Sequence, residues 1–179
     1  MKKKRSTGMQ PDQLASGFRA ELKKTVRHTG LAVCLAATGG LMLSACDSGS
    51  GVGTNYCQSG PNGAVISASG SASVSDDDLT LHGDNIPNNT FGLFYYGNGA
   101  ANAPLGNGTR CVSVNSATTR LGPPMNSGSS GTYTRGVDLP SPTTGGSVIN
   151  PGSTWYFQAW FRDGSSSDLS DGLQIDFTP

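Results

Sequence analysis

From about residue 55 onwards, hydrophobic and polar residues alternate in short runs, and no helical periodicity extends beyond a single turn. The runs are rich in β-branched and aromatic residues and end in Gly, Asn, Pro or Ser, which is typical of strands separated by turns. Seven strands are predicted over residues 64–70, 78–83, 91–97, 110–114, 131–139, 153–162 and 172–177, with 146–150 as a candidate eighth edge strand. The stretches 84–89 and 123–131 are predicted to be loops. This pattern predicts an all-β fold, an antiparallel β-sandwich of jelly-roll-like type with about seven to eight strands.

The run over 153–162 shows hydrophobic residues on both of its faces. The face expected in the core carries Trp155, Phe157, Ala159 and Phe161. The opposite face carries Tyr156, Gln158, Trp160 and Arg162. We interpret Tyr156 and Trp160 as a candidate ligand-binding strip about 13 Å long, at about 3.3 Å per residue, with Arg162 at its end and Tyr95 or Tyr96 as further candidates for the aromatic surface. The alternative is that loops cover these aromatic side chains and that they only pack.

The N-terminal region carries one hydrophobic run, over residues 31–45, behind a basic leader. A helix of that length would span about 22 Å, which is short of a bilayer core of about 30 Å. The run ends in Leu43-Ser44-Ala45-Cys46, which resembles the bacterial lipobox. We therefore expect a lipoprotein signal peptide over 1–45, acylation of Cys46, a flexible tether over 46–54 and a β-sandwich domain over 55–179. An ordinary signal peptide and a retained membrane helix are the alternatives, and translation starts at Met1 or Met9.

Removal of the leader changes the charge of the protein. The remaining 134 residues contain ten aspartates and four arginines but no lysine or glutamate, so their net charge is about −6. An acidic surface of this kind disfavours nucleic acid, whose binding depends on neutralising phosphates. The expected location is the cell envelope, with the N-terminal lipid in the membrane. The outer membrane or cell surface is favoured over the inner membrane, although Asp47 after the lipid cysteine resembles an inner-membrane retention signal of some bacteria.

Two cysteines remain after the predicted cleavage and acylation, namely Cys57 and Cys111. Paired cysteines are typical of exported domains, so a Cys57–Cys111 disulfide is predicted, with two free thiols as the alternative.

Five motifs follow one another over almost the whole domain: GLFYYG (92–97), LGNGTRC (105–111), RLGPP (120–124), PGSTWYFQAWFRD (151–163) and LSDGLQIDF (169–177). In these motifs the chain resembles a β module of about 120 residues that recurs in secreted and surface proteins of planctomycete and myxobacterium-like bacteria. The resemblance implies an extracytoplasmic β module, often appended to larger proteins, and it implies no enzymatic activity. This chain departs from the usual arrangement because the module stands alone behind a lipid anchor.

The sequence offers little for catalysis. His82 is the one histidine after the leader and no G-x-S-x-G motif is present, so a Ser-His-Asp triad is not expected. Aspartate pairs could act on glycosides, which leaves a glycoside-active enzyme as a minor alternative. The segment 163–171 carries Asp163, Asp168 and Asp171, which we expect in a loop, where carboxylates are candidate calcium ligands. Otherwise no cofactor is expected.

Two functions remain in view. In the first, the protein is a lipid-anchored module that binds or adheres to a glycan or an envelope protein. In the second, it is a passive structural lipoprotein without a ligand.

Overall fold

The computed structural model describes residues 51–115 and 117–179, and this part of the chain contains strands but no helix. The strands are β1 (Thr54–Tyr56), β2 (Val65–Ser69), β3 (Thr80–Asp84), β4 (Phe91–Gly97), β5 (Ala100–Leu105), β6 (Gly108–Val112), β7 (Thr119–Asn126), β8 (Tyr133–Gly136), β9 (Thr154–Asp163) and β10 (Ser166–Asp176). All strand pairs in the three sheets are antiparallel. The predicted all-β, sandwich-like fold is confirmed.

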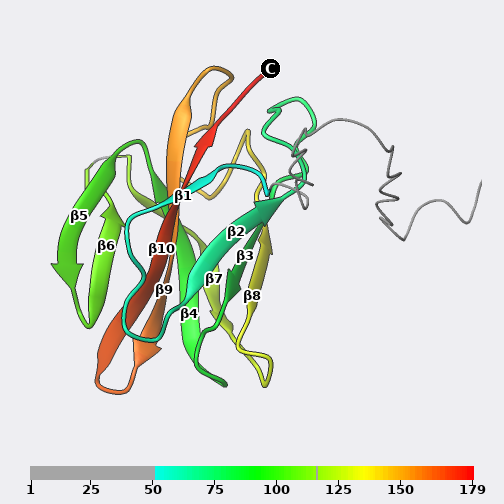
Figure 1. Cartoon of the computed structure of the whole chain (residues 1–179). Helices are drawn as coiled ribbons and strands as arrows, with labels where there is room; N and C mark the ends of the chain where they lie inside the picture. Colours follow the sequence, from blue (N-terminus) through cyan, green and yellow to red (C-terminus); the bar gives the residue numbers. More distant parts are fainter. Residues whose placement is uncertain (1–50, 116) are drawn as a thin grey trace, which may run out of the picture. The chain divides into compact units, whose positions relative to one another are not determined.

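The sheets are stacked in layers (Figure 1). The middle layer is a five-stranded sheet with the order β1-β10-β9-β4-β7. A three-stranded sheet, β2-β3-β8, lies against one of its faces, and the β5–β6 hairpin lies against the other. One face of the middle sheet is therefore covered by a sheet, and the other face is covered in part by the hairpin.

The main hydrophobic core lies between the five-stranded and three-stranded sheets. From β9 it contains the four side chains predicted from alternation, Trp155, Phe157, Ala159 and Phe161. Phe94 and Tyr96 of β4 join them, opposite Ile66 of β2 and Leu81 of β3. Burial of one such large side chain contributes about 1.5–3 kcal/mol, so this core is the main source of stability.

The structure adds three strands that the hydrophobic pattern does not predict. β1 has only three residues, β5 contains no β-branched residue, and β7 contains Pro123 and Pro124. Proline lacks the N–H that a central strand needs, but β7 is an edge strand of the five-stranded sheet. The prediction of a loop over 123–131 is therefore wrong for its first four residues.

One predicted strand is missing, because residues 146–150 adopt no regular structure. Ile149 of this segment is nevertheless buried in the main core, and its N–H donates to the Leu139 carbonyl at 3.3 Å. The hydrophobic side chain of Ile149 correctly indicates burial. Its backbone N–H is satisfied by the Leu139 carbonyl and not by pairing with a neighbouring strand.

The segment 163–171 is also not a loop. It forms the end of a hairpin in which Gly164 and Ser165 connect β9 to β10, with Gly164 in the left-handed region at φ +58°. The described end of the predicted tether, residues 51–54, belongs to the fold as well. There the Val52 N–H donates to the Ala68 carbonyl at 3.1 Å, and Thr54 begins β1.

Candidate functional site

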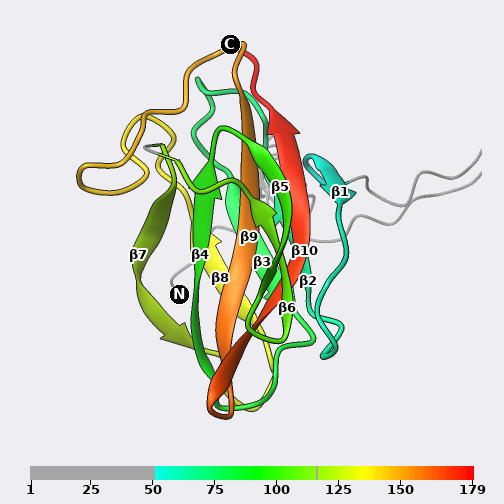
Figure 2. The ribbon, with the colours of Figure 1, turned by 90° about the vertical axis from the view of Figure 1, so that its left-hand side faces the viewer.

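The outward face of β9 is not the open strip that alternation alone predicts. Figure 2 shows the β5–β6 hairpin in front of β9 and β10, whereas β4 and β7 extend beyond it. A second hydrophobic cluster lies on this face and contains Leu93, Tyr95, Val112 and Leu169, with Tyr156 and Trp160 packed against it. The aromatic residues of the outward face therefore have partly a packing role.

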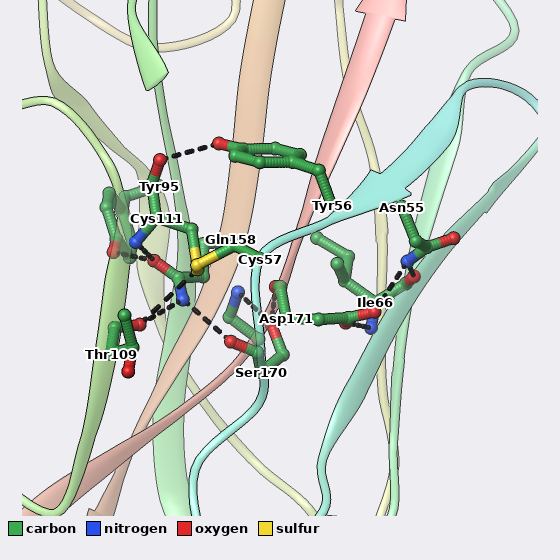
Figure 3. Close-up of a disulfide and its surroundings, with 11 residues drawn as sticks. Asn55, Tyr56, Cys57, Ile66, Tyr95, Thr109, Cys111, Gln158, Ser170 and Asp171 are labelled. Carbon is green, nitrogen blue, oxygen red and sulfur yellow. Dashed lines mark hydrogen bonds between the residues drawn. A yellow bond between two sulfur atoms is a disulfide. The ribbon is translucent and has the colours of Figure 1, made fainter. Parts of the chain in front are cut away.

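Gln158 holds the hairpin on the sheet (Figure 3). Its side chain is fully buried, and its Oε1 accepts hydrogen bonds from the Cys111 N–H at 2.9 Å and from the Tyr95 hydroxyl. Its Nε2 donates to the carbonyls of Thr109 at 2.8 Å and Ser170 at 2.7 Å. Both N–H groups and the carbonyl oxygen of the amide are thus used. Alternation assigns Gln158 to the correct face, but it does not reveal that β6 covers it.

The predicted Cys57–Cys111 disulfide is present and joins the end of β1 to β6. The two Cα atoms lie 6.0 Å apart, and the adjacent Tyr56 hydroxyl donates to the Cys111 carbonyl at 2.6 Å (Figure 3). A covalent bond and a hydrogen bond therefore fix the same residue of β6.

The tip of the hairpin is attached to β9 and β10. The Asn107 N–H donates to the Ser167 carbonyl at 2.7 Å, and the Asn107 side chain donates to the Asp163 carboxylate at 2.7 Å. With attachments at its tip and along β6, the hairpin is a fixed part of the outer surface.

The predicted strip is divided by this arrangement. The Tyr156 ring packs edge-on against Tyr56, with ring centroids 5.5 Å apart. Tyr96 is fully buried in the main core, stacked on Phe157 at 6.0 Å, so the expectation that it belongs to the aromatic surface is wrong. Trp160 and Arg162 remain accessible on this face, with the buried Tyr95 on the neighbouring strand β4.

These three residues line a cavity of about 970 Å³ on the outer face of the middle sheet, which we call the outer groove. It is lined by Phe91, Gly92, Leu93, Tyr95, Leu105, Arg110, Val114, Thr118, Thr119, Arg120, Pro124, Trp160 and Arg162. Its volume lies at the upper end of the range of about 300–1,000 Å³ that is common for small-molecule sites. The exposed fraction of Phe91 is 60%, which is unusual for a side chain of this size and hydrophobicity.

Three arginines reach the outer groove from three different strands: Arg110 from β6, Arg120 from β7 and Arg162 from β9. No aspartate of the described residues lines it. The guanidinium of Arg162 lies 5.6 Å from the centroid of the Trp160 ring, within the range of a cation–π contact. The Nε of Arg110 is buried and has no hydrogen-bond partner among the described residues.

Arg110 also affects the electrostatics of the groove floor. Burial raises the pKa of the Tyr95 hydroxyl, and the positive charge of Arg110 acts in the opposite direction. Because burial disfavours the charged phenolate, the Tyr95 hydroxyl stays neutral, and it donates its hydrogen bond to the Gln158 carbonyl oxygen. The positive potential of the groove therefore comes from the arginines without a compensating phenolate.

The three aspartates considered for calcium are not brought together. Asp163 binds Asn107 at the hairpin tip, and Asp168 accepts hydrogen bonds from the backbone and side chain of Asn62 at 3.1 and 2.8 Å. Asp171 accepts hydrogen bonds from the Ile66 N–H at 2.8 Å and the Asn55 side chain at 2.9 Å. No group of three or more metal-ligating side chains is found within residues 51–115 and 117–179. Each carboxylate instead connects strands or loops of the protein.

The fold also places His82 away from the groove. It lies on β3, in the three-stranded sheet, and its Nε2 is 2.8 Å from the Ser69 hydroxyl. The predicted acylation site, Cys46, lies outside the described residues.

Two groove residues outside the predicted strip, Phe91 and Leu93, carry a signal in the sequence. Phe91, Leu93 and Tyr95 alternate along β4 with the core residues Phe94 and Tyr96, so they belong to the outward face. Arg110 and Arg120 gave no local signal, because pairing and the hairpin bring them to the groove from separate segments.

Comparisons with protein families, with curated proteins and with solved structures find no match for this chain. Within the described residues, no helix has the length and hydrophobicity needed to cross a bilayer.

Proposed function

We propose that this protein is a lipid-anchored, extracytoplasmic binding module that holds a glycan of the cell envelope or surroundings in its outer groove. The observation that carries the proposal is the combination of exposed aromatic surface and convergent polar groups in one cavity of ligand size. Flat aromatic side chains suit the apolar face of a sugar ring, and arginine side chains donate several hydrogen bonds to oxygen acceptors. The lipobox-like segment before Cys46 and the resemblance to secreted β modules support the location.

Binding is favoured over catalysis by the contents of the groove. It contains no histidine or carboxylate of the described residues that could act as a general acid or base. Its side chains are aromatic, aliphatic, hydroxyl-bearing or cationic. Side chains of these kinds bind a ligand through hydrophobic contacts, hydrogen bonds and charge.

Phe91 provides the cleanest test. Because its side chain is largely exposed, Phe91→Ala should leave the folded structure intact, whereas Trp160 also packs against the second hydrophobic cluster. The purified full-length protein would be run through gels containing neutral polysaccharides (xylan, galactomannan) or acidic ones (polygalacturonate, alginate, hyaluronate). We expect retardation by at least one polymer, reduced by about tenfold in apparent affinity in Phe91→Ala.

Val148→Ala is the matched control, since Val148 is also a large exposed hydrophobic residue and lies outside the groove. If no polymer retards the protein, or if both variants behave alike, the glycan-binding function is wrong. The second function, a passive envelope component, would then be the better description.

A further inference from the structure

The distribution of positive charge in the domain is uneven. Residues 46–179 carry only four arginines and no lysine, against ten aspartates. Three of these arginines, Arg110, Arg120 and Arg162, line the outer groove, and no described aspartate does. The fourth, Arg135, lies elsewhere and donates to the Pro123 carbonyl at 2.7 Å. An acidic domain thus presents a cationic cavity.

Gathering like charges is unfavourable unless an anion offsets their repulsion. The three side chains come from separate strands, so no local sequence constraint places them together. The buried Nε of Arg110 has no partner among the described residues, but the Nε of Arg135, outside the groove, is in the same state, so this feature does not distinguish the groove. The convergence of three of the four arginines of residues 46–179 on one cavity indicates that the groove suits an anion.

The chemistry of the lining narrows the anion to a carboxylated sugar polymer. Guanidinium groups bind carboxylates in a planar, two-point geometry, and Phe91 and Trp160 offer flat hydrophobic faces beside them. Thr119 adds a hydroxyl for sugar hydroxyl groups. Each sugar of a uronic-acid polymer has an apolar ring face, hydroxyl groups and one carboxylate. Such a regular series of carboxylates matches arginines that lie on both sides of the groove.

We propose that the outer groove recognises polysaccharides containing uronic acids, with Arg110, Arg120 and Arg162 binding the carboxylates of successive sugar residues. This inference rests on the proposed glycan-binding function and specifies its ligand class. A neutral polysaccharide would leave the three arginines without counter-charges.

The test compares polygalacturonate and alginate, which carry one carboxylate per sugar residue, with the same polymers after chemical reduction of their carboxyl groups to alcohols. Titration of the purified full-length protein should show binding to at least one uronate polymer, weakened about tenfold or more by carboxyl reduction. Binding should also weaken as the salt concentration rises, because the contacts are ionic. Arg120→Gln should reduce the affinity about tenfold, since Arg120 is exposed and its replacement leaves the core untouched.

Arg135→Gln is the matched control, because it removes the same charge outside the groove, and thermal melting would verify that both variants fold. Equal binding of the carboxyl-reduced polymer would overturn the uronate inference and leave glycan binding intact. Equal affinity of Arg120→Gln and Arg135→Gln would also overturn it, as would equally tight binding of poly-L-glutamate, which would show a site for anions without a requirement for sugar. The absence of binding to any polymer, charged or neutral, would reject the proposed function itself.

Discussion

Replacement of Gln158 by methionine should destabilise the domain severely, although the two side chains have similar length. In the native structure the amide satisfies three buried partners, the Cys111 N–H, the Ser170 carbonyl and the Tyr95 hydroxyl, and the partly buried Thr109 carbonyl. Methionine offers no comparable hydrogen bonds. Each buried polar group that loses its partner costs about 1–3 kcal/mol, and partial relaxation reduces the total. We expect the free energy of unfolding to fall by about 3–5 kcal/mol.

Urea unfolding followed by tryptophan fluorescence measures this change, because Trp155 lies in the main core and Trp160 beside the hairpin. Gln174→Met is the control, since Gln174 is a half-exposed residue of the neighbouring strand β10, and its replacement should change the value by less than about 0.5 kcal/mol. A loss below about 1 kcal/mol in Gln158→Met, at an unchanged urea dependence, would show that the buried amide does not hold the hairpin.

Three further predictions concern the anchor, the disulfide and the half-buried carboxylate of Asp171. Replacing both Cys57 and Cys111 with serine should lower the free energy of unfolding by up to about 4 kcal/mol, since their bond constrains the unfolded chain, and unchanged denaturant curves would contradict this. Burial raises the pKa of Asp171 above 3.8, so the folded state holds its proton more tightly and stability should fall as the pH rises through the folded-state value. Asp171→Asn should remove that decline, and unfolding curves between about pH 3 and 7 would test it, with an identical decline in the variant as the contrary outcome. Cys46→Ser should move the protein from membranes to soluble fractions or leave it uncleaved, and unaltered fractionation would argue against a lipid anchor.

The sequence predicted the parts of the fold that local pattern determines. In β9 one of the two alternating sets, Trp155, Phe157, Ala159 and Phe161, is wholly hydrophobic, so the core side chains could be assigned without knowing their neighbours. The sequence of β5 is AANAPL and that of β7 is TRLGPPMN. Both have little intrinsic strand preference. They are strands because a partner supplies the ladder, which is a tertiary effect.

The outer groove was predictable only in part for the same reason. Trp160 and Arg162 belong to a strand whose faces could be read, and both line the cavity. Tyr156 satisfies the same rule but lies against Tyr56, whose position depends on the pairing of β1 with β10. Alternation decides which face of a sheet a residue occupies, and only topology decides what covers that face.

The covering hairpin determines what the outer groove can do. Arg110 is carried by β6, which is fixed by Gln158 and by the disulfide, whereas Arg120 and Arg162 are carried by the sheet itself. The repulsion among these three charges is therefore opposed by folding, before any ligand arrives. A ligand that binds a site already held in its bound geometry loses less free energy to ordering the protein, and so binds more tightly for the same contacts. Loosening the hairpin should consequently weaken binding even where every arginine is retained, because the separation of Arg110 from the other two would no longer be fixed.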